Sequence, residues 1–439
     1  MSSHLLVATP LFGHVSPVVT VGAALAERGH DVVVMTGAPF ADLVRSHGLE
    51  FRSLPEDADP SLTRGPDRLR PRWASSVRDV VSIFVDPLAA QHRAVTAELE
   101  RRPADVILGD TGFLGLQPML LGLPLGIRPP IVGLSVTPIS VVSLDAAPFG
   151  SALRTGVGPH FERRNRRTQW LLSRGPLRPL HRAVDAALHS CDVAAGSFDY
   201  FNQVLTFDQV FHLGSPELEY PRRELPDTVR MIGPVPTAVE ADLPPWWDDL
   251  AGARHVVHVT QGTLANDDVR RLLVPAILGL ADEPDLLVVV ATGGRPVPEL
   301  ILALGDNLPA NVRLADFLPY DRLFPGTSVL LTNGGYGAVQ LAVRHGVPVV
   351  VAGSTEDKPE VAARVAWSGV GLDLRRGRPR PQRIRRAVRT VLEQAAYRDR
   401  AAAVRTAAEA RPDPLALITT EIERLGLAVT DSQPERVVD

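Results

Sequence analysis

Short apolar runs alternate along the chain with longer stretches whose apolar residues recur at helical spacing. Near the start, apolar runs at residues 5–8 and 31–35 flank a helical pattern at residues 18–27. Gly29 follows that pattern at a position where glycine commonly ends a helix. A strand, a helix and a second strand in this order predict a βαβ unit and hence a parallel sheet.

The same alternation continues along the chain, with one break rich in proline and tryptophan at residues 233–236 and 244–247. The sequence therefore predicts an α/β protein with two parallel-sheet halves. The expected divisions are a first domain at residues 1–225, a linker at 226–250, a second domain at 251–415, and a C-terminal helix and tail at 416–439. Further strands are expected at residues 106–108, 131–134, 191–195, 229–232, 256–260, 285–291, 312–314, 328–331 and 348–352.

A glycine-rich segment at residues 332–337 (Thr-Asn-Gly-Gly-Tyr-Gly) joins an expected strand to a helical pattern that Gly346 closes. Free N–H groups and the helix dipole favour negative charge at a helix N-terminus, and glycine lets an anion approach the backbone closely. The segment is typical of an anion site, although three glycines alone fit a plain strand-to-helix turn equally well.

Composition and charge narrow the class of protein. A net charge of −4 gives no global basis for binding nucleic acid or an acidic membrane. Apolar runs are too short to cross a bilayer, and the N-terminal residues lack the basic segment of a signal peptide. Cys191 is the single cysteine, so it cannot form an internal disulfide, and no metal-ligand spacing occurs. These features predict a cytoplasmic protein without a bound metal.

Side chains suited to a nucleotide diphosphate follow several strands of the expected second domain. Ligands bind at the carboxyl ends of the strands in an open parallel sheet, so these side chains should gather at one edge. The glycine segment and a threonine could hold phosphates, a phenylalanine could face a base, two carboxylates could accept hydrogen bonds from hydroxyl groups, and a lysine adds positive charge. Each alone is more typical of a cap, turn or surface position. The set is Thr263, Phe317, Asn333, Gly334, Gly335, Tyr336, Gly337, Glu356, Asp357 and Lys358.

A histidine and an aspartate occupy matching positions in the first domain. His14 lies in residues 10–17, which are expected to form the loop after the first strand, and Asp110 follows the strand at 106–108. A lone loop histidine is commonly a polar surface residue. However, a carboxylate that accepts the Nδ1 proton would orient the ring and leave Nε2 to take a proton. The chain has no Gly-x-Ser-x-Gly elbow or Walker lysine loop, and the first loop lacks Gly-x-Gly-x-x-Gly.

Two motifs resemble those of the UDP-glycosyltransferase-like family (glycosyltransferase family 1, bacterial macrolide-glycosyltransferase type). Residues 13–17 (Gly-His-Val-Ser-Pro) are similar to its Gly-His-x-x-Pro, and residues 331–371, with Asn-Gly-Gly-Tyr-Gly and Glu-Asp-Lys-Pro, resemble its donor signature. The resemblance covers nearly the whole chain. It implies a GT-B fold, in which two Rossmann-like domains face each other across a cleft, the first binding the acceptor and the second the nucleotide sugar.

Residue by residue, the resemblance implies that His14 is the general base and that Asp110 is its partner. It implies the following donor contacts: the diphosphate with Thr263 and residues 334–337, the base with Phe317, and sugar hydroxyl groups with Asp357.

Three positions depart from the family pattern. Asn333 stands in place of a phosphate-binding histidine, Leu341 in place of a glutamate that grips the ribose, and Lys358, the only lysine of the chain, in place of a glutamine that reads glucose hydroxyl groups. The loss of the ribose contact would matter least for a donor without a 2′-hydroxyl group, such as a dTDP-sugar. The lysine argues against a plain glucose donor.

The resemblance implies an inverting, metal-independent glycosyltransferase that moves a sugar from a dTDP- or UDP-sugar to a small hydrophobic natural product, as in antibiotic biosynthesis. The nucleotide sugar is then a co-substrate, and no cofactor is implied. Its partners would be the acceptor and the donor, without nucleic acid or stable membrane insertion, and the protein would be a monomer or homodimer. Two alternatives remain: a non-catalytic protein that keeps the cleft for binding or for helping a partner, and a GT-B enzyme that acts on the sugar nucleotide itself, such as an epimerase.

Overall fold

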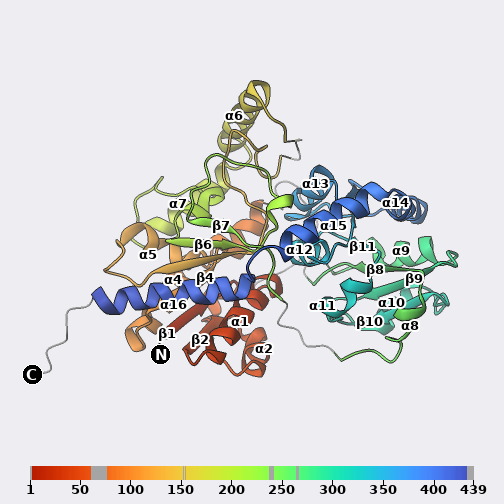
Figure 1. Ribbon diagram of the computed structural model, residues 1–439. Coiled ribbons are helices and arrows are strands. Elements are labelled where there is room, and N and C mark those ends of the chain that lie inside the picture. The colour runs from red at the N-terminus through yellow and green to blue at the C-terminus, as the bar shows by residue number, and fades with distance from the viewer. Residues whose placement is uncertain are drawn as a thin grey trace, which may run out of the picture.

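The computed structural model describes residues 2–60, 77–151, 153, 155–236, 242–263 and 266–432. Within these residues the chain forms two parallel β-sheets, and helices cover both faces of each sheet (Figure 1). No helix in these ranges is long and apolar enough to cross a membrane.

The first sheet has seven strands in the order β3-β2-β1-β4-β5-β6-β7. Three differences from the expected strands occur in it. Residues 191–195 form a turn after a helix, with Asp192 at a φ of 61°, and β3 and β6 were not expected because their sequences mix polar and apolar residues. The sheet also continues to Met231, past residue 225. The strands are β1 (Ser3–Val7), β2 (Asp31–Thr36), β3 (Glu50–Ser53), β4 (Val106–Asp110), β5 (Ile131–Ser135), β6 (Gln209–His212) and β7 (Val229–Met231).

The first helix begins earlier than the sequence predicts. Residues 12–17 were expected in a loop, but α1 starts at Phe12 and contains His14 and Pro17. Pro17 is the sixth residue of α1 and has no N–H to donate to the carbonyl of Gly13, yet the helix continues through it to Glu27. The helices of the first domain are α1 (Phe12–Glu27), α2 (Ala41–Ser46), α4 (Leu88–Arg101), α5 (Gln117–Gly122), α6 (Pro159–Arg174) and α7 (Arg178–His189).

The second sheet has six strands in the order β10-β9-β8-β11-β12-β13. The strand order reverses between β8 and β11, as it does between β1 and β4 in the first sheet, and such a reversal opens a crevice at the carboxyl ends of the strands. The elements are α8 (Asp249–Gly252), β8 (His255–Thr260), α9 (Leu273–Leu280), β9 (Leu286–Ala291), α10 (Val297–Ala303), β10 (Val312–Ala315), α11 (Tyr320–Leu323), β11 (Val329–Thr332), α12 (Tyr336–Arg344), β12 (Val349–Val351), α13 (Lys358–Ser368), β13 (Gly371–Asp373), α14 (Pro381–Glu393) and α15 (Ala395–Glu409).

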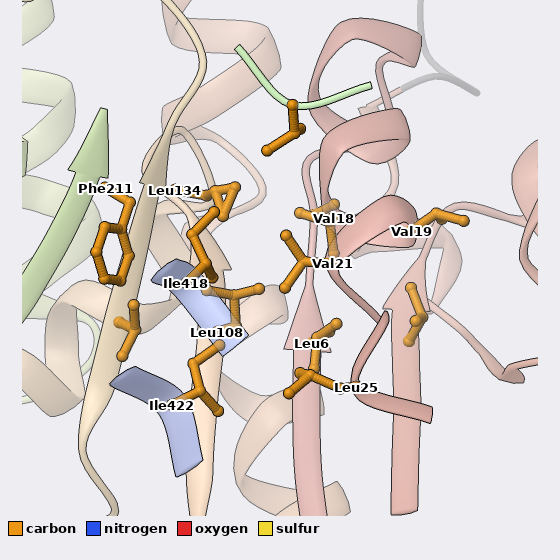
Figure 2. Close-up of a cluster of buried hydrophobic side chains, with 14 of the residues drawn as sticks. Leu6, Val18, Val19, Val21, Leu25, Leu108, Leu134, Phe211, Ile418 and Ile422 are labelled. Atoms are coloured by element: carbon orange, nitrogen blue, oxygen red, sulfur yellow. The ribbon is translucent and has the colours of Figure 1, made fainter. Parts of the chain in front are cut away.

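The C-terminal helix α16 (Pro414–Ser432) returns to the first domain and completes its core. Ile418 and Ile422 are buried against the sheet, beside Leu108 and Leu134 (Figure 2). Glu423 lies between Arg28 and His30 at the end of α1, 2.6 and 2.9 Å from their nitrogen atoms. The last helix therefore stabilises the first domain although it follows the second in sequence.

We expect Ile418→Ala to lower the free energy of unfolding by about 2–5 kcal/mol, because it removes fully buried methyl groups and leaves a cavity. Leu427→Ala on the same helix is the matched control, since Leu427 is 68% exposed and its loss should change stability by less than about 0.5 kcal/mol. Urea unfolding followed by circular dichroism measures both. Equal effects of the two substitutions would contradict the packing described here.

Candidate active site

His14 and Asp110 form a buried pair at the carboxyl edge of the first sheet. The His14 Nδ1 atom lies 2.6 Å from Asp110 Oδ1, and both residues are buried. His14 is in the first turn of α1 and Asp110 is the last residue of β4, the neighbour of β1 in the sheet. The other contacts of Asp110 are backbone N–H groups, those of Thr9 and Gly112, at 2.9 and 2.8 Å. The aspartate is thereby held in place to accept a hydrogen bond from His14 Nδ1–H.

The two side chains shift each other's pKa. Burial alone would lower the pKa of His14, but the charge and hydrogen bond of Asp110, with a smaller effect from Asp357, raise it above its usual value. Burial would raise the pKa of Asp110, but His14 and the Thr9 N–H outweigh this and lower it. Asp110 thus stays ionised beside a histidine of increased basicity.

The two sheet edges face each other, since the ring centroids of Phe12 and Phe317 lie 6.4 Å apart, and the charge of Asp357 contributes to the raised pKa of His14. Asp357 directly precedes α13 in the second domain, and burial of its carboxylate raises its pKa. Next to it, Lys358 is buried and its Nζ contacts the Glu356 carboxylate. Glu356 has a φ of 57°, a conformation that non-glycine residues seldom adopt, so the tight turn after β12 positions this acid–lysine pair. Lys358 is therefore paired within its own loop.

Asn333 and Gly334 directly follow strand β11 and lie in close contact with segments of neighbouring strands. The Asn333 Nδ2 group donates to the carbonyl of Gln261, while its buried Oδ1 atom has no hydrogen-bond partner among the described residues. Gly334 has a φ of 99°, and a Cβ atom there would lie 2.9 Å from the side chain of Val351. Its N–H donates to Thr332 Oγ1 at 3.2 Å, so this N–H is already engaged. Only glycine fits this position.

Helix α12 presents its N-terminus at the same edge. Gly335 precedes the helix, and the N–H groups of its first turn, including those of Tyr336 and Gly337, have no acceptor within the helix. The Tyr336 side chain does not point to this edge. It is buried in the domain interface, where its hydroxyl group lies 2.8 Å from His212 Nε2. Tyr336 can therefore contribute its backbone, but not its ring, to an anion site.

Phe317 and Thr263 lie at the exposed part of the edge. Phe317 is 39% exposed and rests on Gly294, where a Cβ atom would lie 3.0 Å from its ring. Its ring centroid is 6.4 Å from that of Phe12, which precedes Gly13-His14 in the first domain. Thr263 is exposed. An exposed ring at the crevice is able to stack on a base.

A cavity of about 490 Å³ adjoins Asn333 and Lys358. Several of its lining residues were not among the predicted site residues, although the basic run at residues 375–378 is visible in the sequence. Leu341, by contrast, is buried in the apolar core and does not line this cavity. The additional lining residues are Gln261, Arg271, Leu272, Ala352, Gly353, Ser354, Thr355, Arg375, Arg376, Gly377 and Arg378.

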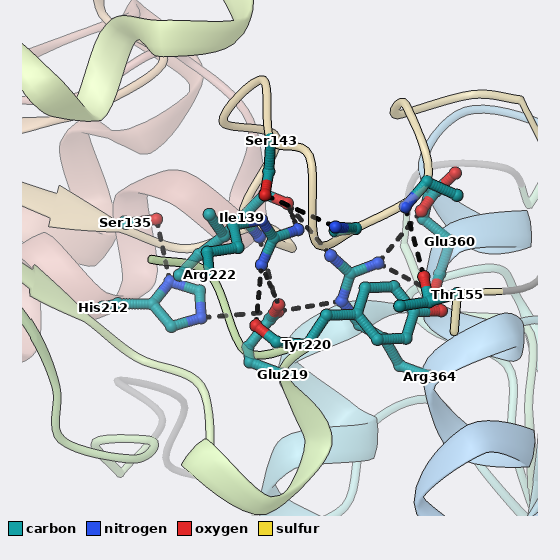
Figure 3. A network of polar contacts seen from close by, with 12 residues as sticks. Ser135, Ile139, Ser143, Thr155, His212, Glu219, Tyr220, Arg222, Glu360 and Arg364 are labelled. Atoms are coloured by element: carbon teal, nitrogen blue, oxygen red, sulfur yellow. Dashed lines mark hydrogen bonds and ion pairs between the residues drawn. The ribbon is translucent and has the colours of Figure 1, made fainter. Parts of the chain in front are cut away.

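A buried network of polar side chains joins the two domains near this cleft (Figure 3). Arg364 of α13 contacts Glu219 of the first domain at 2.9 Å and donates to the carbonyl of Ile139 at 3.0 Å. Glu219 also accepts a hydrogen bond from the Tyr336 hydroxyl group at 3.3 Å, and His212 lies 3.6 Å from it. Burial would raise the pKa of Glu219, but the charge of Arg364 and the contacts of His212 hold it well below its usual value.

No short motif pointed to this network, because its members are far apart in the sequence. Glu219 and Arg364, for example, are 145 positions apart.

The chain is similar to glycosyltransferases over nearly its whole length. Residues 285–425 match the family described as "Erythromycin biosynthesis protein CIII-like, C-terminal domain". The chain is 37% identical over 421 residues to 4'-demethylrebeccamycin synthase of Lentzea aerocolonigenes, covering 94% of this chain and 97% of that protein. It is 33% identical over 453 residues to UDP-glycosyltransferase 2 of Phaeomoniella chlamydospora, covering 97% and 96%.

Solved structures agree with this similarity in sequence. The structure of the glycosyltransferase VinC in complex with dTDP matches with a TM-score of 0.68 and 20% identity, covering 97% of this chain and 100% of VinC. The GT-B fold expected from the sequence, with two parallel-sheet domains, is confirmed by this match.

We expect Arg364→Met to lower the free energy of unfolding by about 3–5 kcal/mol, because it takes from the buried Glu219 carboxylate the closer of its two arginines and leaves only Arg222, at 3.4 Å. The double variant Arg364→Met, Glu219→Gln removes both charges and should be more stable than the single variant. Arg398→Met, at an exposed position, is the control. Urea unfolding of the three variants tests this, and a double variant no more stable than Arg364→Met would contradict it.

Proposed function

Because this chain belongs to the UDP-glycosyltransferase-like family and is a glycosyltransferase, we propose that it transfers a sugar from a dTDP- or UDP-sugar to a hydroxyl group of a small hydrophobic natural product. We further propose that the reaction inverts the anomeric centre, needs no metal, and uses His14 as general base. The observation that carries this proposal is the buried His14–Asp110 pair at 2.6 Å, opposite Asp357 of the second domain.

On the acceptor side, Asp110 holds the Nδ1 position of His14 and leaves Nε2 to take the proton of the acceptor hydroxyl group. The acceptor oxygen bonds to the anomeric carbon as the bond to the diphosphate oxygen breaks on the opposite face. Phe84 lies beside His14, with ring centroids 5.8 Å apart, and Tyr200 lies next to Phe84. These aromatic rings support a hydrophobic acceptor.

On the donor side, the N-terminus of α12 supplies N–H groups and a positive dipole end for the charge that develops on the leaving diphosphate. Asp357, directly before α13, is the proposed acceptor of hydrogen bonds from sugar hydroxyl groups, and the exposed ring of Phe317 is the proposed face for the base. Burial of Leu341 in the core leaves no carboxylate at that position for a ribose 2′-hydroxyl group. VinC, which is similar in fold, binds dTDP. Both points favour a dTDP-sugar over a UDP-sugar.

We expect His14→Ala to lower kcat by about 10²–10⁴-fold, the usual contribution of a general base. Binding of dTDP and UDP should be unchanged, because the predicted nucleotide contacts lie on the second domain. His160→Ala, an exposed histidine on α6, is the control. Turnover with a panel of dTDP- and UDP-sugars and calorimetric titration with both diphosphates measure the two properties. Full turnover by His14→Ala would refute the assignment of the base, and a reaction that consumes donor without an acceptor would point to an epimerase or hydrolase.

The pH profile should follow the raised pKa of His14. The base acts in its neutral form, so kcat/KM should rise with pH through an apparent pKa above 6.5, the usual histidine value. In Asp110→Asn the carboxylate charge is gone, and the largest remaining effect on the pKa of His14 is burial, which lowers it and exceeds the small effect of Asp357. The rise of kcat/KM should therefore move to lower pH. The plateau should fall, because an amide can hold the wrong histidine tautomer. If kcat/KM rose at the same pH in the unchanged protein and in Asp110→Asn, the effect of Asp110 on His14 would be contradicted.

A further inference from the structure

One face of helix α6 is exposed and carries an unusual combination of residues. The helix projects from the first domain at the top of Figure 1. At about 100° per residue, six exposed positions fall within an arc of about 140°. Trp170 and Leu171 are 53% and 51% exposed at the centre and border of this arc. The six residues, here called the α6 face, are Arg163, Arg166, Arg167, Trp170, Leu171 and Arg174.

The charges of the α6 face are not neutralised within the chain. None of its four arginines forms an ion pair with a carboxylate in the parts of the chain that the structure describes. The one acid of the helix, Glu162, contacts Arg223 instead, at 2.7 Å. The Arg174 guanidinium lies over the Trp170 ring, 4.7 Å from its centroid. Positive charge and exposed apolar surface therefore coincide on one side of the helix, in a protein whose net charge is −4.

The opposite side of α6 attaches it to the domain. Asn165 is fully buried, and its side chain donates to the carbonyl of Leu144 at 2.8 Å. The α6 face is thus held outward by fixed contacts. It cannot pair with the same face of a second copy, because four arginines would then oppose four others.

We propose that the α6 face binds reversibly to the surface of membranes that contain anionic phospholipid. Guanidinium groups pair with phosphate through two parallel hydrogen bonds, and basic residues are attracted to anionic headgroups. Transfer of tryptophan and leucine side chains to the boundary between headgroups and acyl chains is favourable. An exposed helix that combines arginine with tryptophan and leucine has the composition of helices that lie at a membrane surface. The helix lies on the surface and does not cross it.

The test is sedimentation of the full chain with vesicles of phosphatidylcholine alone and of phosphatidylcholine with about one third phosphatidylglycerol. We expect binding only to the anionic vesicles at low salt, and its loss at about 1 M NaCl, where the Debye length is about 3 Å. Tryptophan fluorescence should shift to shorter wavelength with anionic vesicles, and this shift should be absent in Trp170→Phe.

Charge-matched variants separate the α6 face from overall charge. At about fivefold per arginine, Arg163→Gln, Arg166→Gln and Arg167→Gln together should lower the partition coefficient about 100-fold. The control combines Arg380→Gln, Arg386→Gln and Arg398→Gln, exposed arginines of the second domain, and should bind like the unchanged protein. Circular dichroism checks that both variants fold.

Three outcomes would overturn the proposal. The first is absence of binding to anionic vesicles at low salt, and the second is an equal loss of binding in the two triple variants. The third is binding of poly-glutamate, or concentration-dependent dimerisation on size exclusion, that requires the α6 arginines while vesicles do not bind. That result would assign the face to an acidic protein or to a second copy.

Discussion

The contact between the two domains is built around a buried ion pair, Glu219 with Arg364, which the Tyr336 hydroxyl group joins. Taking two charges out of water is unfavourable unless each is closely paired and hydrogen-bonded, and a partner removed leaves the other charge uncompensated. Glu219 and Arg364 are 3% and 1% exposed, and both have further polar contacts. Any large rotation of the domains would break this arrangement. The pair therefore fixes which surfaces of the two sheets face each other.

The interface contacts also position the candidate active site, because α12 and α13 take part in both. Arg364 is on α13, whose start places Asp357 and Lys358 at the cleft, and Tyr336 begins α12, whose N-terminus faces the same cleft. The side chains of Arg364 and Tyr336 lie in the interface, while the beginnings of their helices form the proposed donor edge. The charge of Asp357 thereby reaches His14 and adds to the effect of Asp110. One set of contacts positions groups from both domains.

Arginine performs different tasks in this chain according to its surroundings. Arg364 is buried and paired, and its guanidinium also lies over the Tyr220 ring, 4.6 Å from the centroid. Arg28 holds the last helix through Glu423 at the surface of the first domain. The arginines of the α6 face have no such partners among the described residues. Arginine thus forms a buried ion pair between the domains, a surface ion pair that attaches the last helix, and exposed positive charge on α6. Only its neighbours distinguish these roles.

The sequence by itself determined the two parallel-sheet domains, since strands buried on both faces must be continuous apolar runs that alternate with helices. It also located His14, Asp110 and residues 333–337 at strand ends, because the carboxyl edge of a parallel sheet is where loops meet. The tertiary structure alone decided that α1 begins before His14, that β6 forms from Gln209–His212, and that residues 191–195 turn instead of pairing. It alone decided that the Tyr336 ring points away from the carboxyl edge of the second sheet and into the interface, where Glu219 and Arg364, 145 positions apart, are in contact. Local sequence patterns indicate which side chains must be buried. The partner of a buried polar group, by contrast, depends on how distant segments pack.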